Sequence, residues 1–219
     1  MTDDRVRRVL DHTVVARPWM CPEIAMRLIT HECPLWLARE EDVHAMGWET
    51  PYWAFAWPGG QALARYVLDH PELVRGRTVL DFGAGGAVEG IAARMAGARR
   101  VVASDIDPVA ELAMRENARL NRVALETTTD DLIGVDDRAW EVVLAGDVFY
   151  DAEFSARVLG WLGALAQRGA VVLLGDPYRG NVPSEHVDVL WECDAPFDTD
   201  VRGLHLKRAQ VARVKSDAR

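Results

Sequence analysis

Cysteine is scarce in this chain, with three residues among 219: Cys21, Cys33 and Cys193. An odd number without a CxxC spacing argues against a disulfide framework and favours a reducing compartment. Long apolar runs are missing as well, because no stretch approaches the roughly 18 uninterrupted apolar residues of a membrane-spanning helix. The N-terminal segment mixes acids with its arginines, unlike a secretion signal or a transit peptide. These absences predict a cytoplasmic protein without a membrane partner.

The chain also lacks an excess of positive charge. Its formal net charge is −9, whereas a nonspecific nucleic-acid binder carries a basic surface. We therefore expect no nucleic-acid partner. The spacing of Cys21, His31, Cys33 and His44 matches no standard zinc site, so we expect no metal either.

The composition and the hydrophobic pattern of the chain change at about residue 77. Residues 1–76 hold five of the eight tryptophans, and from about residue 77 short apolar strands alternate with helices. This alternation is typical of an α/β fold with a parallel sheet between helices. We expect one domain, 1–219, in which 1–76 is an N-terminal helical and aromatic elaboration of a core at 77–219. The expected strands are 78–83, 100–105, 124–129, 141–146 and 170–175.

Start and stop signals place the helices between these strands. Asp107 followed by Pro108 is a strong helix start, and Gly97 suits the end of the preceding helix. We expect Pro58-Gly59-Gly60 to form a bend before the helix that leads into the first strand. The expected helices are 60–70, 86–96, one beginning at 108, and 153–167; a final antiparallel strand pair is expected at 188–194 and 204–214.

The first expected strand runs into a glycine-rich turn, VLDFGAGGAVEG (79–90). A strand, a glycine turn and a helix bring a ligand close to backbone N–H groups, and Gly83 and Gly85 leave no Cβ in the way. In dinucleotide-binding dehydrogenases the strand before the glycines is apolar and a third glycine stands at the position of Val88. Asp81 would repel a pyrophosphate but attract an ammonium. The pattern favours a ligand with a cationic amino-acid end, such as S-adenosylmethionine.

Acids also follow the second and third strands. Asp105 lies 24 residues after Asp81, where an acid can accept hydrogen bonds from both hydroxyls of a ribose. Asp131 and the backbone N–H of Leu132 could meet an adenine edge, with a solvated acidic turn as the open alternative. Each acid alone is ambiguous, because strand ends and turns often carry acids. Their occurrence at successive strand ends predicts a nucleoside site.

Three motifs, DFGAGG (81–86), ASDIDP (103–108) and GDVFYD (146–151), resemble those of the seven-strand methyltransferases. The DxFY element resembles that of a group of protein-lysine methyltransferases, and the block PYWAFAWPGGQALARYVLDH (51–70) is similar to the electron-transfer-flavoprotein β-subunit lysine methyltransferases. The resemblance implies a Rossmann-like seven-stranded methyltransferase sheet, S-adenosylmethionine as cofactor, and a lysine of the electron transfer flavoprotein β subunit as substrate. The cofactor-binding residues expected from it are Trp57, Gly60, Asp81, Gly83, Ala84, Gly85, Asp105, Ile106, Asp131, Leu132 and Gly146.

The GDVFYD element carries the residues expected to act in catalysis. We expect Asp147 to orient the incoming lysine ammonium and Tyr150 to shape its channel. A helix cap and ordinary packing are the alternative roles of these two residues. Trp53 and Phe149 are expected to bind the substrate.

The aromatic run PYWAFAW (51–57) is expected to form a half-buried wall of the site. Trp57 should line the methionine end of the cofactor, and Phe55 should lie in the core. A one-residue slip would exchange the two faces of the run. The chain also departs from the DxGxGxG pattern of the family, in which the third glycine would stand at position 87. This chain has Ala87 there, and its third glycine is Gly86, one place earlier.

Other functions share parts of this pattern. Methylation of a different protein lysine, such as one on a ribosomal protein, would use the same residues, and so would a small-molecule N-methyltransferase with an enclosed acceptor pocket. An NAD-dependent oxidoreductase and a cofactor-binding module without turnover remain as alternatives. We expect a monomer.

Overall fold

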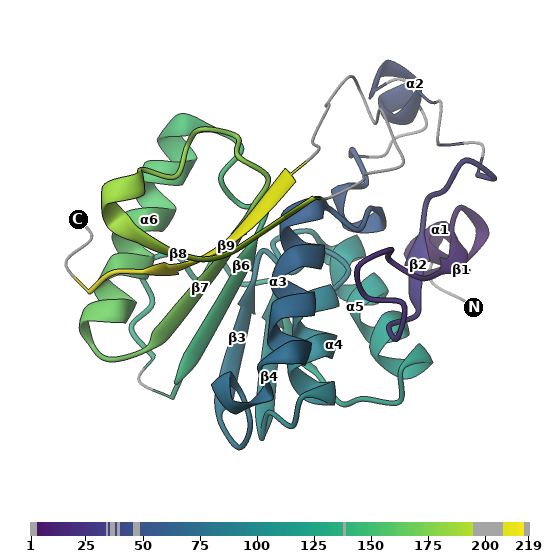
Figure 1. Ribbon diagram of the computed structural model, residues 1–219. Coiled ribbons are helices and arrows are strands. Elements are labelled where there is room, and N and C mark those ends of the chain that lie inside the picture. Colours follow the sequence, from purple (N-terminus) through teal and green to yellow (C-terminus); the bar gives the residue numbers. More distant parts are fainter. Residues whose placement is uncertain are drawn as a thin grey trace.

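The computed structural model describes residues 4–33, 35, 38, 40–45, 49–137, 139–194 and 208–216. Its centre is a seven-stranded sheet in the order β5-β4-β3-β6-β7-β9-β8, with helices on both faces (Figure 1). Strands β5 to β7 are parallel, and β9 runs antiparallel to β7 and β8. The strands are β3 (Thr78–Phe82), β4 (Arg100–Ser104), β5 (Glu126–Thr128), β6 (Val142–Gly146), β7 (Val171–Asp176), β8 (Val187–Asp194) and β9 (Arg208–Val214).

The sheet confirms the predicted α/β architecture and each predicted strand. The final antiparallel pair is confirmed as β8 and β9, although 204–207 of its second member lie outside the described residues. Successive residues of the central strands face opposite sides of the sheet. Val142 and Leu144 of β6 therefore join one apolar core, and Val143 joins the other.

Helices cover both faces of the sheet. On one face lie α3 (Pro58–Asp69), α4 (Val88–Met95) and α5 (Pro108–Leu120), and on the other lies α6 (Ala152–Gln167), as Figure 1 shows. Leu63 and Ile91 pack in the first core, whereas Leu162 packs in the second. The predicted helix start at Pro108 is confirmed, since the Asp107 carboxylate accepts a hydrogen bond from the N–H of Val109 at 2.7 Å.

The Pro-Gly-Gly segment corrects the sequence prediction. Pro58, Gly59 and Gly60 do not form a bend before α3 but are its first turn. This turn lies against the ends of β6 and β7: a Cβ on Gly59 would come within 2.7 Å of the carbonyl carbon of Gly175, and one on Gly146 within 2.7 Å of the Gly60 Cα. Side chains at these positions would separate helix from sheet, so glycines on both elements permit the contact.

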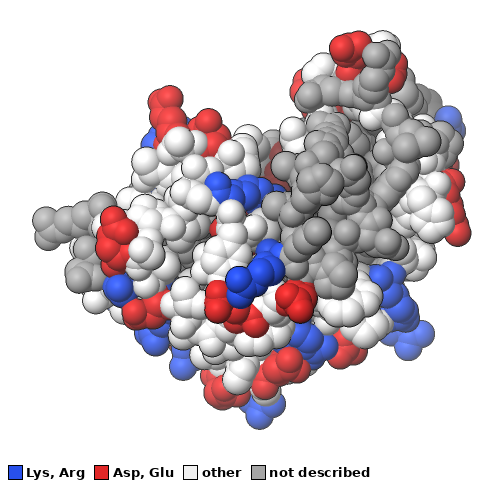
Figure 2. All heavy atoms as spheres, turned by 45° about the horizontal axis from the view of Figure 1, so that its top comes forward, with Lys and Arg blue, Asp and Glu red and all other residues white. Residues whose placement is uncertain are grey.

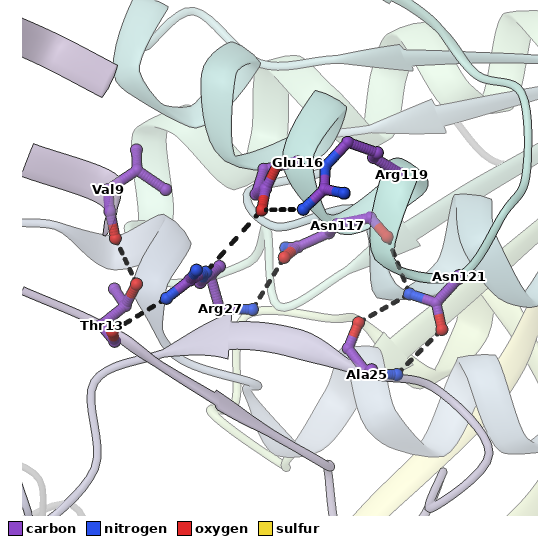
Figure 3. A network of polar contacts seen from close by, with 8 residues as sticks. All are labelled: Val9, Thr13, Ala25, Arg27, Glu116, Asn117, Arg119 and Asn121. Carbon is purple, nitrogen blue, oxygen red and sulfur yellow. Dashed lines mark hydrogen bonds and ion pairs between the residues drawn. The ribbon is translucent and has the colours of Figure 1, made fainter. Parts of the chain in front are cut away.

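Part of the N-terminal elaboration lies against α5. It contains α1 (Asp4–Asp11), the antiparallel pair β1 (Val14–Ala16) and β2 (Met26–Leu28), and α2 (Glu40–Ala45). Asn121 both donates to the carbonyl and accepts from the N–H of Ala25, and Asn117 accepts from the N–H of Arg27 at 2.7 Å (Figure 3). These bonds attach β2 to α5. Short 3₁₀ turns complete the described fold: η2 (Tyr52–Ala54), η3 (Pro71–Leu73) and η4 (Ser184–His186).

Charge is dispersed over the surface in view in Figure 2, where acidic and basic groups are interspersed among uncharged residues. In the part of the chain that the structure describes, no helix is long and apolar enough to cross a membrane. Within the same residues, no group of three or more His, Cys, Asp or Glu side chains is arranged to hold a metal ion.

Candidate active site

The predicted site residues gather where the strand order reverses. From β3 the chain proceeds to β4 and β5 on one side, and then returns to β6 on the other side of β3. In such sheets the carboxyl ends of the strands beside this switch point form a crevice that binds ligands. Asp81 near the end of β3 and Gly146 at the end of β6 lie at this point.

The glycine turn has the backbone that its sequence predicts. Gly83 and Gly85 have φ of +65° and +50°, a region that residues with a Cβ rarely adopt. Ala87 also has a positive φ, +64°, and precedes α4. Gly86, by contrast, does not have a positive φ. Its surroundings are crowded, because a Cβ there would come within 2.7 Å of Met26 Cε and 3.0 Å of the Trp53 carbonyl oxygen. Packing against the N-terminal elaboration thus disfavours a side chain at the displaced glycine of this chain.

Asn117 connects the glycine turn to that elaboration. Its amide donates to the carbonyl of Gly86 at 2.9 Å while its oxygen accepts from Arg27. The side chain is fully buried. The turn that would cradle a cofactor is therefore held from behind by α5 and β2.

Asp81 is a buried acid beneath the glycine turn. Its Oδ2 accepts a hydrogen bond from the N–H of Gly90 at 2.8 Å, and its Oδ1 is buried without a hydrogen-bond partner among the described residues. Burial raises the pKa of Asp81 to about 7. A carboxylate with one unsatisfied oxygen is suited to a cationic group.

Glu89 is a further buried acid, which the sequence analysis did not identify. It belongs to the first turn of α4 and is 4% exposed. A Cβ on Gly60 would lie 2.9 Å from its Oε1, so the glycines of the first turn of α3 leave room for this carboxylate. Burial raises the pKa of Glu89 well above its ordinary value, and the nearby carboxylates of Asp81 and Asp147 raise it further. The site therefore concentrates buried carboxyl groups whose ionisation is disfavoured.

Asp105 follows β4 and stabilises the glycine turn. Its Oδ2 accepts from the N–H of Gly85 at 2.9 Å and its Oδ1 from the N–H of Asp107 at 3.0 Å. Burial raises the pKa of Asp105. Each oxygen has a second lone pair and can accept a further hydrogen bond, so a ribose contact stays a prediction. Ile106 is 74% exposed beside it, as a residue that covers one face of a ligand would be.

The loop after β5 places the remaining nucleoside candidates. Asp131 is exposed and its Oδ1 accepts from the N–H of Ile133 at 3.0 Å. The side chain of Leu132 is buried in the second core. The roles of both residues toward an adenine ring stay predictions.

Asp147, the first residue of the DxFY element, is engaged on both sides. Its Oδ2 accepts from the N–H of Gly60 at 2.6 Å, and its Oδ1 accepts from the guanidinium of Arg179 at 2.7 Å. Its backbone has φ of +59°, and its N–H donates to Gly175. Burial raises the pKa of Asp147 to about 6, while Arg179 and the Gly60 N–H act in the opposite direction. Asp147 therefore caps the first turn of α3 and not α6, the helix that follows it. Its other oxygen binds the Arg179 cation.

The other members of the DxFY element divide between surface and core. Tyr150 is 65% exposed and stacks on Phe154 with ring centroids 5.5 Å apart. Burial raises the pKa of Tyr150, and Asp105 and Tyr52 add to the effect. Tyr150 thus lies near Asp105 and near Tyr52 of the aromatic run, and its role in a lysine channel stays a prediction. Phe149 is fully buried in the second core, and this placement does not support its predicted contact with a substrate.

The aromatic run forms a wall beside this site. Trp57 is half-buried, donates its indole N–H to the carbonyl of Tyr52 at 2.9 Å, and lies 5.8 Å from the Arg179 guanidinium. Trp53 is 5% exposed and packs behind the glycine turn with the N-terminal core. Phe55 is half-buried, not fully in the core as expected, with its ring 5.7 Å from that of Trp57. The two tryptophans therefore have separate places, and their roles stay predictions.

The residues present fit S-adenosylmethionine. The glycine turn, Asp105 and Ile106 provide backbone, carboxylate and apolar groups for an adenosine, and the unsatisfied oxygen of Asp81 fits an ammonium. No pyrophosphate would be favoured so close to buried carboxylates. Fold and site together define a Rossmann-like S-adenosylmethionine-dependent methyltransferase.

Comparison with known proteins agrees with this class and narrows it. The model of the ribosomal protein L11 methyltransferase family (PrmA) matches residues 62–146. Among solved structures, a ribosomal protein L11 methylase from Lactobacillus delbrueckii subsp. bulgaricus has a TM-score of 0.53 at 20% identity, covering 72% of this chain and 78% of that one. Magnesium protoporphyrin IX methyltransferase from Synechocystis PCC 6803, with bound SAM, has a TM-score of 0.52 at 18% identity, covering 71% and 77%. These two structures share the fold.

The curated relatives are closer. The electron transfer flavoprotein beta subunit lysine methyltransferase of Danio rerio is 42% identical over 188 residues, which cover 84% of this chain and 72% of the relative. The Xenopus laevis protein is 42% identical, covering 82% and 72%, and the human protein is 41% identical, covering 73% and 61%. The chain belongs to the electron transfer flavoprotein β-subunit lysine methyltransferase family.

Proposed function

We propose that the protein transfers a methyl group from S-adenosylmethionine to a lysine ε-amine of the electron transfer flavoprotein β subunit. The single observation that supports this most is the cation held by Asp147 beside the Trp57 ring. A carboxylate and an aromatic face are the two groups that attract an alkylammonium. Relatives of the chain are named as lysine methyltransferases of this subunit. The carboxylate of Asp147 and the ring of Trp57 are groups that suit a lysine side chain as acceptor.

Each group at the switch point has a role in this proposal. Gly83, Ala84 and Gly85 approach the cofactor with their backbone, Asp105 accepts from its ribose, and Asp81 attracts its ammonium. Glu89 adds a second buried carboxyl group near Asp81, whose charge helps to raise the pKa of Glu89. The other proposed cofactor contacts are Trp57, Gly60, Ile106, Asp131, Leu132 and Gly146.

The acceptor side must present a neutral amine. A free lysine has a pKa of about 10.4, so its deprotonation at pH 7 costs about 4.6 kcal/mol. Desolvation of the ammonium between Trp57 and Tyr150 reduces this cost, and Asp147 aligns the amine for an in-line displacement. When bound, S-adenosylmethionine supplies an electrophilic methyl group on a sulfonium. The acceptor proton leaves to water.

A second protein substrate has a specific observation in its favour. The L11 methyltransferase family model covers residues 62–146, which include the glycine turn and end at Gly146, one residue before Asp147. This segment is chiefly the cofactor half of the molecule, so it supports the reaction more than the substrate. Ribosomal protein L11 is accordingly the second candidate. Membership of the lysine methyltransferase family excludes the alternative of an NAD-dependent oxidoreductase.

The test is a direct comparison of substrates. The protein is incubated with labelled S-adenosylmethionine and, separately, purified electron transfer flavoprotein, ribosomal protein L11, and a small-molecule extract. We expect label on a lysine of the flavoprotein β subunit, located by peptide mass spectrometry. Label on L11 alone would select the second candidate, and label in the small-molecule fraction alone would reject a protein substrate. A monomeric state and a cytoplasmic location stay predictions.

A further inference from the structure

A cation already lies at the acceptor side of the proposed site. One N–H of the Arg179 guanidinium donates to Asp147 Oδ1 at 2.7 Å, and the guanidinium carbon lies 5.8 Å from the centroid of the Trp57 ring. Both partners are largely withdrawn from solvent, with side-chain exposures of 14% for Arg179 and 7% for Asp147. Among the ion pairs that the described residues form, all others except Arg27–Glu116 have at least one partner that is well exposed, where a pair contributes little to stability.

The loop after β7 brings Arg179 to this position. Asp176 Oδ2 accepts from the N–H groups of Tyr178 and Arg179, at 2.7 and 3.2 Å. Tyr178 has φ of +62°, which is uncommon for a bulky residue. Asn181 donates to the carbonyl of Phe149 at 3.0 Å, so the loop is attached to the DxFY element itself. The backbone is therefore built to direct this arginine toward Asp147.

The same two groups are what a substrate lysine needs. Asp147 Oδ2 accepts from the N–H of Gly60, whereas Oδ1 accepts from the Arg179 cation, so Oδ1 is the oxygen at which a second cation would compete. A lysine ammonium at Oδ1 would lie beside the guanidinium, and two like charges in a desolvated site repel each other. Binding of a lysine ammonium therefore favours departure of the guanidinium.

We propose that Arg179 is a resident occupant of the acceptor-amine subsite, which a substrate lysine must displace from Asp147 before its amine is methylated. The inference rests on the proposed function, because it takes Asp147 to be the group that binds the lysine. Arg179 keeps the subsite closed in the absence of a substrate, and the protein surface around the target lysine must offer the displaced guanidinium a new partner. A substrate with an acid near its target lysine fits this requirement.

Displacement weakens apparent substrate binding by the fraction of molecules in which the subsite is open. If about a tenth of the molecules are open, removal of the arginine strengthens binding about tenfold. The variants are Arg179→Ala and Arg179→Gln. The matched control is Arg208→Ala, since Arg208 lies in the same region, 5.5 Å from the Tyr178 ring, and pairs with Glu192.

The first measurement is the dissociation constant for purified electron transfer flavoprotein, by calorimetry without S-adenosylmethionine, together with KM and kcat. A pH near 8.5 keeps Asp147 ionised, because Arg179 lowers its pKa and its removal has the reverse effect. We expect Kd and KM to fall about tenfold in both variants, with kcat kept and the control unchanged. A fall in kcat with Kd and KM unchanged would show that Arg179 only positions Asp147, and would overturn the inference.

A second measurement needs no external substrate. Arg179→Lys puts a primary amine in the resident position. We expect it to methylate itself at position 179, at a rate independent of enzyme concentration, seen by intact mass and peptide mapping. The lone pair of the neutral amine forms the new N–C bond as the C–S bond breaks, sulfur keeps that electron pair, and the amine proton passes to water.

Together the two measurements distinguish a failure of the proposed function from a failure of the inference about Arg179. An inactive wild type with a self-methylating Arg179→Lys variant would reject the flavoprotein as substrate and keep the inference. An active wild type whose Arg179→Lys variant gains no methyl group, and whose Arg179→Ala variant binds no better, would keep the proposed function and reject the inference.

Discussion

At the scale of single residues, the glycine turn shows what one displaced glycine costs. Ala87 holds φ of +64°, where an L-residue other than glycine is strained by roughly 1 kcal/mol. We predict that Ala87→Gly raises the free energy of unfolding by about 1 kcal/mol in urea denaturation. Ala84→Gly in the same turn is the control, because Ala84 has no positive φ and is buried. It should lower stability; an equal effect of both changes would contradict this account.

The buried acids give a pH dependence with a definite sign. Asp81 has a pKa of about 7 when folded, raised by burial from an ordinary 3.8. Between these values the folded state holds more protons, so this carboxyl lowers stability as pH rises toward 7. We predict that Asp81→Asn flattens the decline in unfolding free energy between pH 5 and 8, measured by chemical denaturation. The exposed Asp131, changed to Asn, should leave the profile as in wild type, and an unchanged slope in Asp81→Asn would refute the prediction.

At the scale of elements, the contact of α3 with β6 and β7 depends on glycines. A methyl group on Gly146 would meet the buried Glu89 carboxylate and come within 2.7 Å of the Gly60 Cα, and overpacking of this kind costs roughly 1–3 kcal/mol. We predict that Gly146→Ala lowers the free energy of unfolding by about 2 kcal/mol or more. Gly160→Ala is the matched control: it lies within α6, a Cβ there meets no described atom within 4 Å, and better helix propensity should add about 0.5–1 kcal/mol. Equal stabilities would contradict the close contact.

The same elements show how far sequence reasoning reached. The strands and most helix limits could be predicted, because they depend on local signals such as the Asp107-Pro108 start and runs of β-branched residues. The predicted bend at Pro58-Gly59-Gly60 is wrong, because glycine is normally unfavourable in a helix and only the packing of α3 against Gly175 explains its presence there. Glu89 could not be recognised for a related reason. Its position on α4 looks like an ordinary helix surface until α3 covers it.

At the scale of the whole molecule, the acceptor side joins segments far apart in the chain. Trp57 precedes α3, Asp147 follows β6 and Arg179 follows β7. No local pattern links a tryptophan to an arginine more than a hundred residues later, so Arg179 could not be found from sequence. Asp105 and Asp147 could be predicted from the sequence, because each follows a parallel strand and the carboxyl ends of such strands meet at one edge of the sheet.

The central claim is that Asp147 binds the lysine to be methylated, and Asp147→Asn tests it most directly. Asparagine tolerates the positive φ of this position and keeps an oxygen for the N–H of Gly60, so the fold should persist. The measurement is the dissociation constant for S-adenosylmethionine by calorimetry, alongside kcat on the electron transfer flavoprotein β subunit by mass spectrometry. We predict affinity within about twofold of wild type and kcat lower by about 100-fold or more, as for loss of an aligned charged contact. Turnover close to wild type, with the cofactor bound, would contradict the claim.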